Sequence, residues 1–281
     1  MSIKNLILIV SSLFGISSFS YAAVDFVNIL NLPTSDINKI ESSMARSLLK
    51  QQSSIITKRG SVKLTTEEKA KIGGYTTTPA NYDIAFDDPL SGDLTGLANN
   101  IAFRNATKKL PGAQGIDIYS AQKIGTNGPK PEEGDYVVAN GRPWSFTSNE
   151  YTAGRFGQAK LSDPVASPTE QVAIYKVNAY SAKPIGGIST ISKEVEYVYP
   201  SGSAFRVKGV TQSTLKNGKI FSEITLVEVD AVPIDATIIH YKGGMPLTKE
   251  AIEAVDIQIR LKTIESEEAE ISGATCRNFV S

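Results

Sequence analysis

The sequence changes from a helical to a strand-like pattern near residue 112, and this change limits the folds that the chain can adopt. Before that point, apolar residues recur every three or four positions, as on one face of an amphipathic helix. After it, short β-like runs alternate with Gly, Pro, Asn and Ser. Helices gathered in the first part and strands in the second are typical of an α+β protein. The β-like runs are GIDIYSA, GDYVVAN, QVAIYKVNAY, KEVEYVYP, SAFRVKGVTQ and FSEITLVEVDAV.

Local signals predict where several elements begin and end. Ser35 is a candidate N-cap for a first helix, and Thr65 is one for a second helix that the glycines at 73–74 are expected to end. A third helix is predicted over residues 94–110, where Pro and Gly close it. Asn217-Gly218 predicts a tight β-hairpin between its flanking strands. The first helix carries an apolar stripe formed by Ile37, Ile40, Met44 and Leu48.

Both ends of the chain are predicted to lie outside the main fold. Residues 1–22 are expected to be a signal peptide, because a lysine precedes an apolar run and small residues follow it. The mature protein would then begin near Ala23 and be secreted. That run is too short to cross a bilayer, and no later segment has the ~20 apolar residues that a transmembrane helix needs. Residues 23–74 are expected to form an N-terminal helical segment, and residues 241–281 a last strand around Val255 followed by an acidic tail.

The composition excludes several classes of function. Lys and Arg together number 29, as do Asp and Glu, so no net charge attracts the chain to nucleic acid or to an anionic membrane. Cys276 is the only cysteine, which rules out a disulfide within the chain. His240 is the only histidine, and the shortage of both residue types argues against a metal site and against Ser-His or Cys-His nucleophiles. His240 itself is expected to be structural, at the end of a strand.

Two glutamates stand out in the run SKEVEYVYPSGSAFRV. Glu194 and Glu196 are two residues apart at the predicted start of a strand, so their side chains are expected on the same face. Like charges side by side repel each other and cost stability. One interpretation is an exposed charged face on which Lys193 and Arg206 supply counter-charges. The other is a pair of carboxylates retained for their chemistry.

The surrounding sequence favours the second interpretation. KEVEYVYPSGSAFRVKGV resembles the Glu-x-Glu segment of the mono-ADP-ribosyltransferases, in particular the Arg-Ser-Glu group to which many bacterial exotoxins belong. Upstream, GRPWSFTSNEYTAGRFG resembles the second region of that family, and NNIAFRNATKKLPGAQGIDIYSA resembles the helix and strand of its first region. These regions occur in the family's order over residues 75 to 230. The resemblance implies an α+β core over residues 75–240, with a mixed β structure of two packed sheets.

The resemblance also implies a reaction, with NAD as the substrate and no metal. Glu196 would stabilise the oxocarbenium-like centre that forms when the nicotinamide–ribose bond breaks. Glu194 would orient or deprotonate the attacking group. A glutamate at that place in the family goes with arginine as the acceptor, because a carboxylate can hold a guanidinium through two hydrogen bonds. The implied function is transfer of ADP-ribose to an arginine of a host protein. Delivery into the host cell would need a separate subunit or another route.

The family's Ser-Thr-Ser motif can be aligned in two ways. Keeping the distance to the following helix places its first serine on Ser145, whereas matching the preceding aromatic pattern places it on Ser148. Either hydroxyl could brace Glu196. The resemblance thus implies that Ser145 or Ser148 acts in catalysis beside the glutamates. Thr147, which lies between them, is assigned to NAD binding, as are Tyr119, Ser120 and Phe156. An ordinary strand followed by a helix cap would also explain this stretch.

The first region departs from the family pattern. Ser120 stands after Tyr119, at the place where the family has an arginine that contacts the NAD phosphates. Three candidates for a relocated cation are Lys123, Arg104 and Arg142. Tyr119 and Phe156 are aromatic residues of the kind that line nucleotide pockets, and they are equally candidates for the core. Three interpretations therefore stay open, namely a transferase, an NAD glycohydrolase and a secreted binding protein without catalytic activity.

Overall fold

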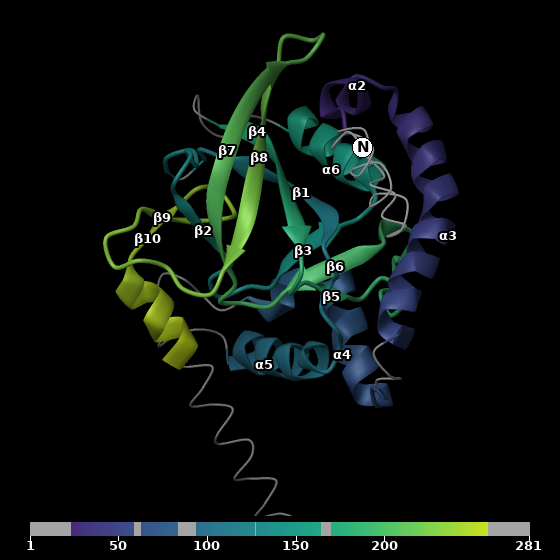
Figure 1. Ribbon diagram of the computed structural model, residues 1–281, viewed down its shortest axis with the longest axis vertical. Coiled ribbons are helices and arrows are strands. Elements are labelled where there is room, and N and C mark those ends of the chain that lie inside the picture. Colours follow the sequence, from purple (N-terminus) through teal and green to yellow (C-terminus); the bar gives the residue numbers. More distant parts are fainter. Residues whose placement is uncertain (1–23, 59–62, 84–93, 127, 164–169, 258–281) are drawn as a thin grey trace, which may run out of the picture.

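The computed structural model describes residues 24–58, 63–83, 94–126, 128–163 and 170–257, so the predicted signal peptide and most of the acidic tail lie outside the described residues. The architecture is α+β, as the sequence predicts (Figure 1). The α-helices are α2 (Phe26–Leu30), α3 (Thr34–Lys58), α4 (Thr66–Thr77), α5 (Leu94–Lys108), α6 (Glu150–Ser162) and a helix over residues 249–257; two 3₁₀ turns are η1 (Pro79–Tyr82) and η2 (Ser192–Glu194). Of the helices that the structure describes, none combines the length and the apolar character that crossing a membrane demands.

The helix boundaries agree in part with the predicted caps. Thr65 caps α4 as expected, and Glu68 completes a capping box with it. The glycines at 73–74 do not end this helix, which continues to Thr77. Neither glycine has a positive φ, and a Cβ on Gly74 would lie only 2.7 Å from the Tyr82 hydroxyl, so close packing accounts for that residue.

Two other predictions are wrong, one for the start of the first long helix and one for the last element of the chain. Helix α3 begins at Thr34, which places Ser35 inside the helix instead of at its cap. The last strand expected around Val255 is a helix over residues 249–257. Val255 is buried against Leu97 and Ile101 of α5, and this contact stabilises a helix in which one face is apolar.

Ten strands of the described chain form one continuous hydrogen-bonded sheet, which we call the ladder, in the order β10-β9-β2-β7-β8-β4-β1-β3-β6-β5. The strands are β1 (Ile116–Ile124), β2 (Tyr136–Val138), β3 (Trp144–Thr147), β4 (Gln171–Ala179), β5 (Lys183–Pro184), β6 (Glu196–Tyr199), β7 (Ala204–Thr214), β8 (Ile220–Val229), β9 (Ile238–His240) and β10 (Pro246–Leu247). Strand β1 pairs with β4 along its whole length but with β3 only through Tyr119 and Thr147.

The ladder folds over at β1, so that its two parts enclose the main core. The Trp144 ring of β3 lies 5.0 Å from the Tyr175 ring of β4 and 5.4 Å from the Phe205 ring of β7. Phe146 and Tyr199 extend the same aromatic cluster. The two sheets expected from the sequence are thus two layers of one continuous ladder, joined at β1.

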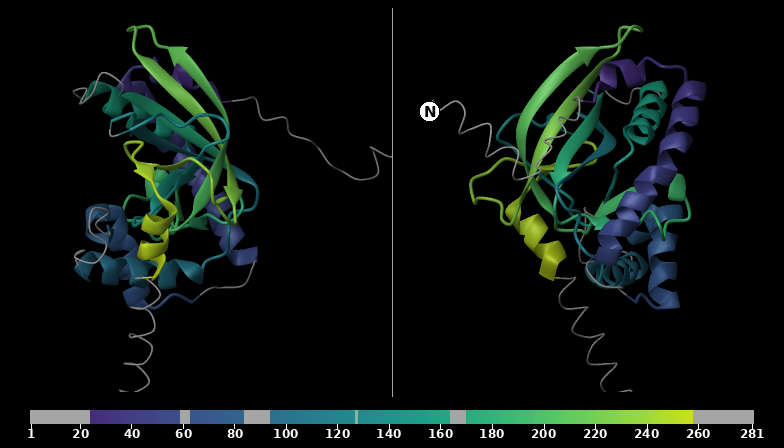
Figure 2. Two further views of the ribbon diagram at one scale, coloured as in Figure 1. Left: turned by 90° about the vertical axis from the view of Figure 1, so that its left-hand side faces the viewer. Right: turned by 45° about the vertical axis from the view of Figure 1, so that its right-hand side comes forward.

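The helices cover the ladder on two sides. Helices α3 and α6 lie side by side and contact each other, while α4 and α5 contact each other at one end of the molecule (Figures 1 and 2). The β7–β8 hairpin lies on the side opposite α3. Helix α6 also packs against β1 and β3, so it stands beside the point where the ladder folds.

The predicted Asn217-Gly218 hairpin is present, and Gly218 has a φ of 78°. A side chain at this φ is disfavoured because its Cβ crowds the backbone. We expect Gly218→Ala to lower the free energy of unfolding by about 1 kcal/mol in urea titrations. Gly209→Ala is the matched control, because Gly209 lies in the same hairpin without a positive φ and with open space around it. Equal losses in both variants would contradict this explanation.

Candidate active site

The two glutamates do not share one strand face as the sequence predicted. Glu194 ends the 3₁₀ turn η2, and Glu196 is the first residue of β6. Val195 between them has a φ of 47°, a left-handed conformation that β-branched residues rarely adopt. Its side chain is fully buried in the main core, and the Thr147 hydroxyl donates a hydrogen bond to the Glu194 carbonyl. Tertiary packing therefore interrupts the strand immediately before Glu196.

Both glutamates nevertheless line one cavity of about 510 Å³, which we name the carboxylate cavity. It is bordered by β1, β3, α4, α6, η2 and β6. Its lining includes the predicted site residues Tyr119, Ser120, Ser145, Thr147, Phe156, Glu194 and Glu196. Residues far apart in the sequence are thus brought together at the fold in the ladder.

Glu196 is buried and braced. It is 7% exposed, and its Oε1 accepts a hydrogen bond of 2.6 Å from the Ser145 hydroxyl. The Tyr75 hydroxyl lies 2.8 Å from the same Ser145 oxygen and 3.1 Å from the Pro143 carbonyl. Burial raises the pKa of Glu196 to about 7, while the hydrogen bond from Ser145 lowers it and the charge of Glu194 raises it further. This carboxyl group therefore titrates near neutral pH.

The two candidate serines of the motif lie in different surroundings. Ser145 donates to Glu196, whereas the Ser148 backbone N–H reaches the Val195 carbonyl at 3.5 Å and its side chain interacts with Tyr197. Ser145, rather than Ser148, contacts the buried carboxylate. The alignment that keeps the distance to α6 corresponds to this geometry.

Glu194 is held by an arginine that the sequence analysis did not single out. The Arg155 Nη2 on α6 donates a hydrogen bond of 2.8 Å to Glu194 Oε1. Arg155 also contacts both carboxylate oxygens of Glu41 through its Nε, at 3.1 Å each. Glu41 lies on α3, is fully buried, and accepts a further hydrogen bond from Thr152. One guanidinium thus neutralises a buried carboxylate and orients an accessible one.

Helix α3 also holds Glu196. The buried Gln52 side chain donates a hydrogen bond of 2.8 Å to the Glu196 carbonyl. The sequence contains one sign that α3 contributes to the site. Glu41 lies four residues after Ile37, on the face of the helix that is buried in the core. A charged residue on an apolar stripe indicates a buried partner. Its partner Arg155 lies 114 residues away, which no local pattern reveals.

The remaining predicted residues contribute to the cavity in different ways. Tyr119 is 4% exposed and contacts the Phe26 ring edge-on at 5.2 Å, so it belongs both to the core and to the cavity wall. Phe156 is 37% exposed at the cavity, beside the Arg155 guanidinium. Among the described residues, no three His, Cys, Asp or Glu side chains gather as a metal ion would require.

The Ser120 side chain takes part in hydrogen bonds within the chain. Its hydroxyl oxygen accepts hydrogen bonds from Trp144 Nε1 at 2.9 Å and from the Gln122 amide at 3.2 Å. Of the three candidate cations, Arg104 lies near Asp256 and lines a different cavity. Lys123 and Arg142 line a second cavity next to the carboxylate cavity, which shares Gln122 with it.

The hydrogen bond from Ser145 generates a first prediction for this site. Ser145→Ala removes the donor that lowers the pKa of Glu196, so that pKa should rise above about 7. Ser148→Ala is the matched control and should leave it unchanged. Carboxyl chemical shifts measured by NMR across a pH titration would show both. A pKa that moves in the Ser148 variant and not in the Ser145 variant would reverse the assignment.

Burial of Glu196 should also make stability depend on pH. Its pKa is about 7 in the folded protein, against 4.5 for an ordinary glutamate, so the folded state holds the proton more tightly. The free energy of unfolding therefore falls as the pH rises from about 4.5 to about 7, and this loss of stability reaches its full size above that interval. We expect Glu196→Gln to stabilise the protein at about pH 8, by an amount on the order of 3 kcal/mol. Near pH 4 the difference should largely vanish.

Urea titrations at both pH values test this expectation, and Glu132→Gln serves as an exposed control. A stability gain from Glu196→Gln that is the same at both pH values would show that the carboxyl does not titrate in this range.

Comparison with known proteins places this geometry in context. No family model matches the sequence, and no curated protein matches it. The structure is similar to the Vis toxin of Vibrio splendidus, an ADP-ribosyltransferase, with a TM-score of 0.57 and 18% identity over 78% of this chain and 99% of that one. A complex of Vis with agmatine gives a TM-score of 0.56 at 18% identity, over 80% and 99% of the two chains. Plx2a, an ADP-ribosyltransferase toxin of Paenibacillus larvae, gives 0.50 at 16% identity, over 66% and 96%. This chain therefore has the fold of the bacterial ADP-ribosyltransferase toxins.

Proposed function

We propose that this protein is a secreted mono-ADP-ribosyltransferase of the Arg-Ser-Glu type, which transfers ADP-ribose from NAD to an arginine of a host protein. The observation that carries the proposal is the buried Glu196 carboxyl, braced by Ser145 in a cavity that also contains Glu194. The fold shared with ADP-ribosyltransferase toxins supports it. The proposed export rests on the apolar N-terminal run alone.

Glu196 supplies the first step of the proposed reaction. The bond between the ribose C1′ and the nicotinamide nitrogen breaks, its electron pair leaves with nicotinamide, and C1′ becomes cationic. An ionised carboxylate in a site that is largely shielded from water stabilises this charge. The Ser145 hydroxyl orients one oxygen of that carboxylate. Because burial alone favours the protonated form, the cationic nicotinamide ring and the developing charge would favour the ionised one.

Glu194 supplies the second step. An acceptor guanidinium attacks C1′, a C–N bond forms, and the proton that it releases passes to Glu194. This carboxylate already binds a guanidinium within the chain, since Arg155 occupies its Oε1 at 2.8 Å. The complex of Vis with agmatine, which carries a guanidinium, supports the same acceptor class.

The contact between Arg155 and Glu194 also favours a second candidate function, that of an NAD glycohydrolase. Arg155 is anchored to Glu41 and occupies the side of Glu194 that would hold an incoming arginine. Water is small enough to attack C1′ without displacing it.

Nicotinamide release from NAD by residues 23–281, with and without agmatine, tests the proposed function. Glu196→Gln should lower release by a factor of about 100 or more, because it removes the charge that faces the cationic centre. Glu194→Gln should abolish the stimulation by agmatine and spare the slow reaction with water. Glu132→Gln, an exposed substitution outside the carboxylate cavity, is the control.

The possible outcomes separate the candidates. Release that agmatine accelerates supports the transferase, and release that agmatine does not affect supports the glycohydrolase. A folded protein that releases no nicotinamide would contradict both. Calorimetric titration with NAD would then test the remaining interpretation, a binding protein without catalytic activity.

A further inference from the structure

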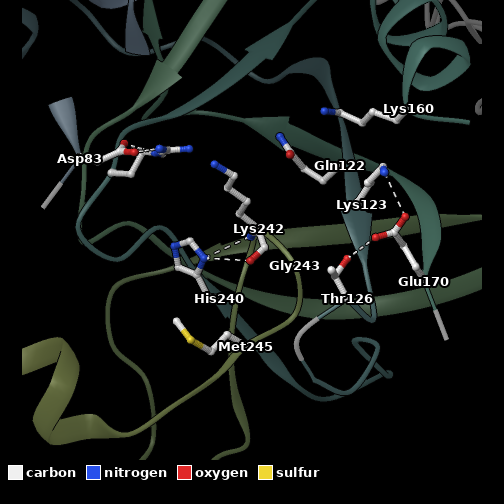
Figure 3. A pocket seen from close by; sticks show the side chains of 11 residues that line it. Asp83, Gln122, Lys123, Thr126, Lys160, Glu170, His240, Lys242, Gly243 and Met245 are labelled. Carbon is white, nitrogen blue, oxygen red and sulfur yellow. Dashed lines mark hydrogen bonds and ion pairs between the residues drawn. The ribbon is translucent and has the colours of Figure 1, made fainter. Parts of the chain in front are cut away.

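A second cavity, of about 550 Å³, adjoins the carboxylate cavity and shares Gln122 and Lys160 with it. We name it the cation cavity because its charged lining consists of four cations and two carboxylates. In the view of Figure 3, Gln122 lies between the ends of the Lys160 and Lys242 side chains, which come from different parts of the chain. The charged residues are Lys123, Arg142, Lys160, Lys242, Asp83 and Glu170.

Two of these cations have carboxylate partners within the cavity. Arg142 pairs with Asp83, and the Lys123 ammonium lies 3.0 Å from Glu170. Within the part of the chain that the structure describes, no carboxylate comes within ion-pair distance of Lys160 or Lys242. The cavity therefore has an excess of two positive charges.

The excess of positive charge is unfavourable for the lysines themselves. Burial lowers the pKa of Lys160, and the charge of Lys123 lowers it further, although Asp163 acts in the opposite direction. Burial also lowers the pKa of Lys242, and Arg142 and Lys160 add to that effect. Cations that repel one another in a partly buried space are stabilised by a bound anion.

We propose that the cation cavity binds the phosphate groups of the dinucleotide through Lys160 and Lys242. This inference rests on the proposed function, in that NAD occupies the carboxylate cavity. The phosphates are covalently attached to the ribose that Glu196 faces, and the cation cavity begins at Gln122, next to that site. Ser120 offers no charge and already accepts two hydrogen bonds. The two lysines would thus supply the positive charge that is absent at position 120.

Calorimetric titration with ADP tests the inference without catalysis, because ADP carries both phosphates and lacks nicotinamide. Lys160→Gln and Lys242→Gln should each weaken ADP binding by about tenfold, the usual loss for a charge-assisted hydrogen bond. Lys160→Arg should retain most of the affinity, which separates loss of charge from misfolding. Lys208→Gln is the control, because Lys208 is exposed on β7 outside both cavities.

Two further ligands identify what the site recognises. Adenosine, which lacks phosphate, should bind weakly and with the same affinity to every variant. Inorganic pyrophosphate should compete with ADP in the parent protein. ADP affinity that is unchanged in the double lysine variant would overturn the inference. Pyrophosphate binding that depends on the lysines, without any binding of ADP, would also overturn it and indicate a site for free anions.

This experiment and the NAD assay can fail separately. Loss of ADP binding in the lysine variants of a protein that does not cleave NAD would support the cation cavity and contradict the proposed function. Cleavage of NAD with the same KM in the parent and the double lysine variant would support the proposed function and contradict the role of the cation cavity.

Discussion

The single point of pairing between β1 and β3, at Tyr119 and Thr147, is the constraint on which the candidate site depends. A ladder that continued along its full length there would extend the sheet and close the space between the two strands. Because it does not, β3 and β6 turn toward the opposite layer and place Trp144 and Phe146 in the main core. The side chains on the other side of the fold remain available to line the carboxylate cavity, where Ser145 and Glu196 meet.

The two carboxylates are kept in different electrostatic states. Glu196 is withdrawn from water, which raises its pKa to about 7, although hydrogen bonds from Ser145 and Ser189 lower it. The Glu194 side chain is 17% exposed and contacts the Arg155 guanidinium. A cationic group that approaches Glu196 would favour its charged form, whereas Glu194 already has a cation beside it within the chain. Such a division suits a reaction in which one group stabilises a transient cation and the other takes up a proton.

The features that the sequence predicts correctly are those that depend on local backbone chemistry. Thr65 at a helix start and Asn217-Gly218 between strands act through their own backbone geometry, and both predictions are confirmed. The conformation of Glu194 could not be predicted, because the left-handed backbone at Val195 is imposed by the core around its side chain and not by its neighbours in sequence. The serine register and the Arg155 contacts depend on which strand or helix lies opposite, and this too is decided by tertiary structure. The helix over residues 249–257 shows the same limit, since Val255 gains its partner from α5.

The two hydrogen-bonded links from α3 have a consequence for how the protein is divided into parts. Glu41 anchors Arg155, which contacts Glu194, and Gln52 holds the backbone of Glu196. The sequence motifs that predict a transferase begin near residue 75, after α3, so the part of the chain that carries the motifs and the part that shapes the candidate site are not the same. A gene fragment chosen by these motifs alone would omit a helix that contacts the surroundings of both glutamates. In this protein, α3 belongs to the scaffold of the candidate site as much as the segments that bear the two glutamates do.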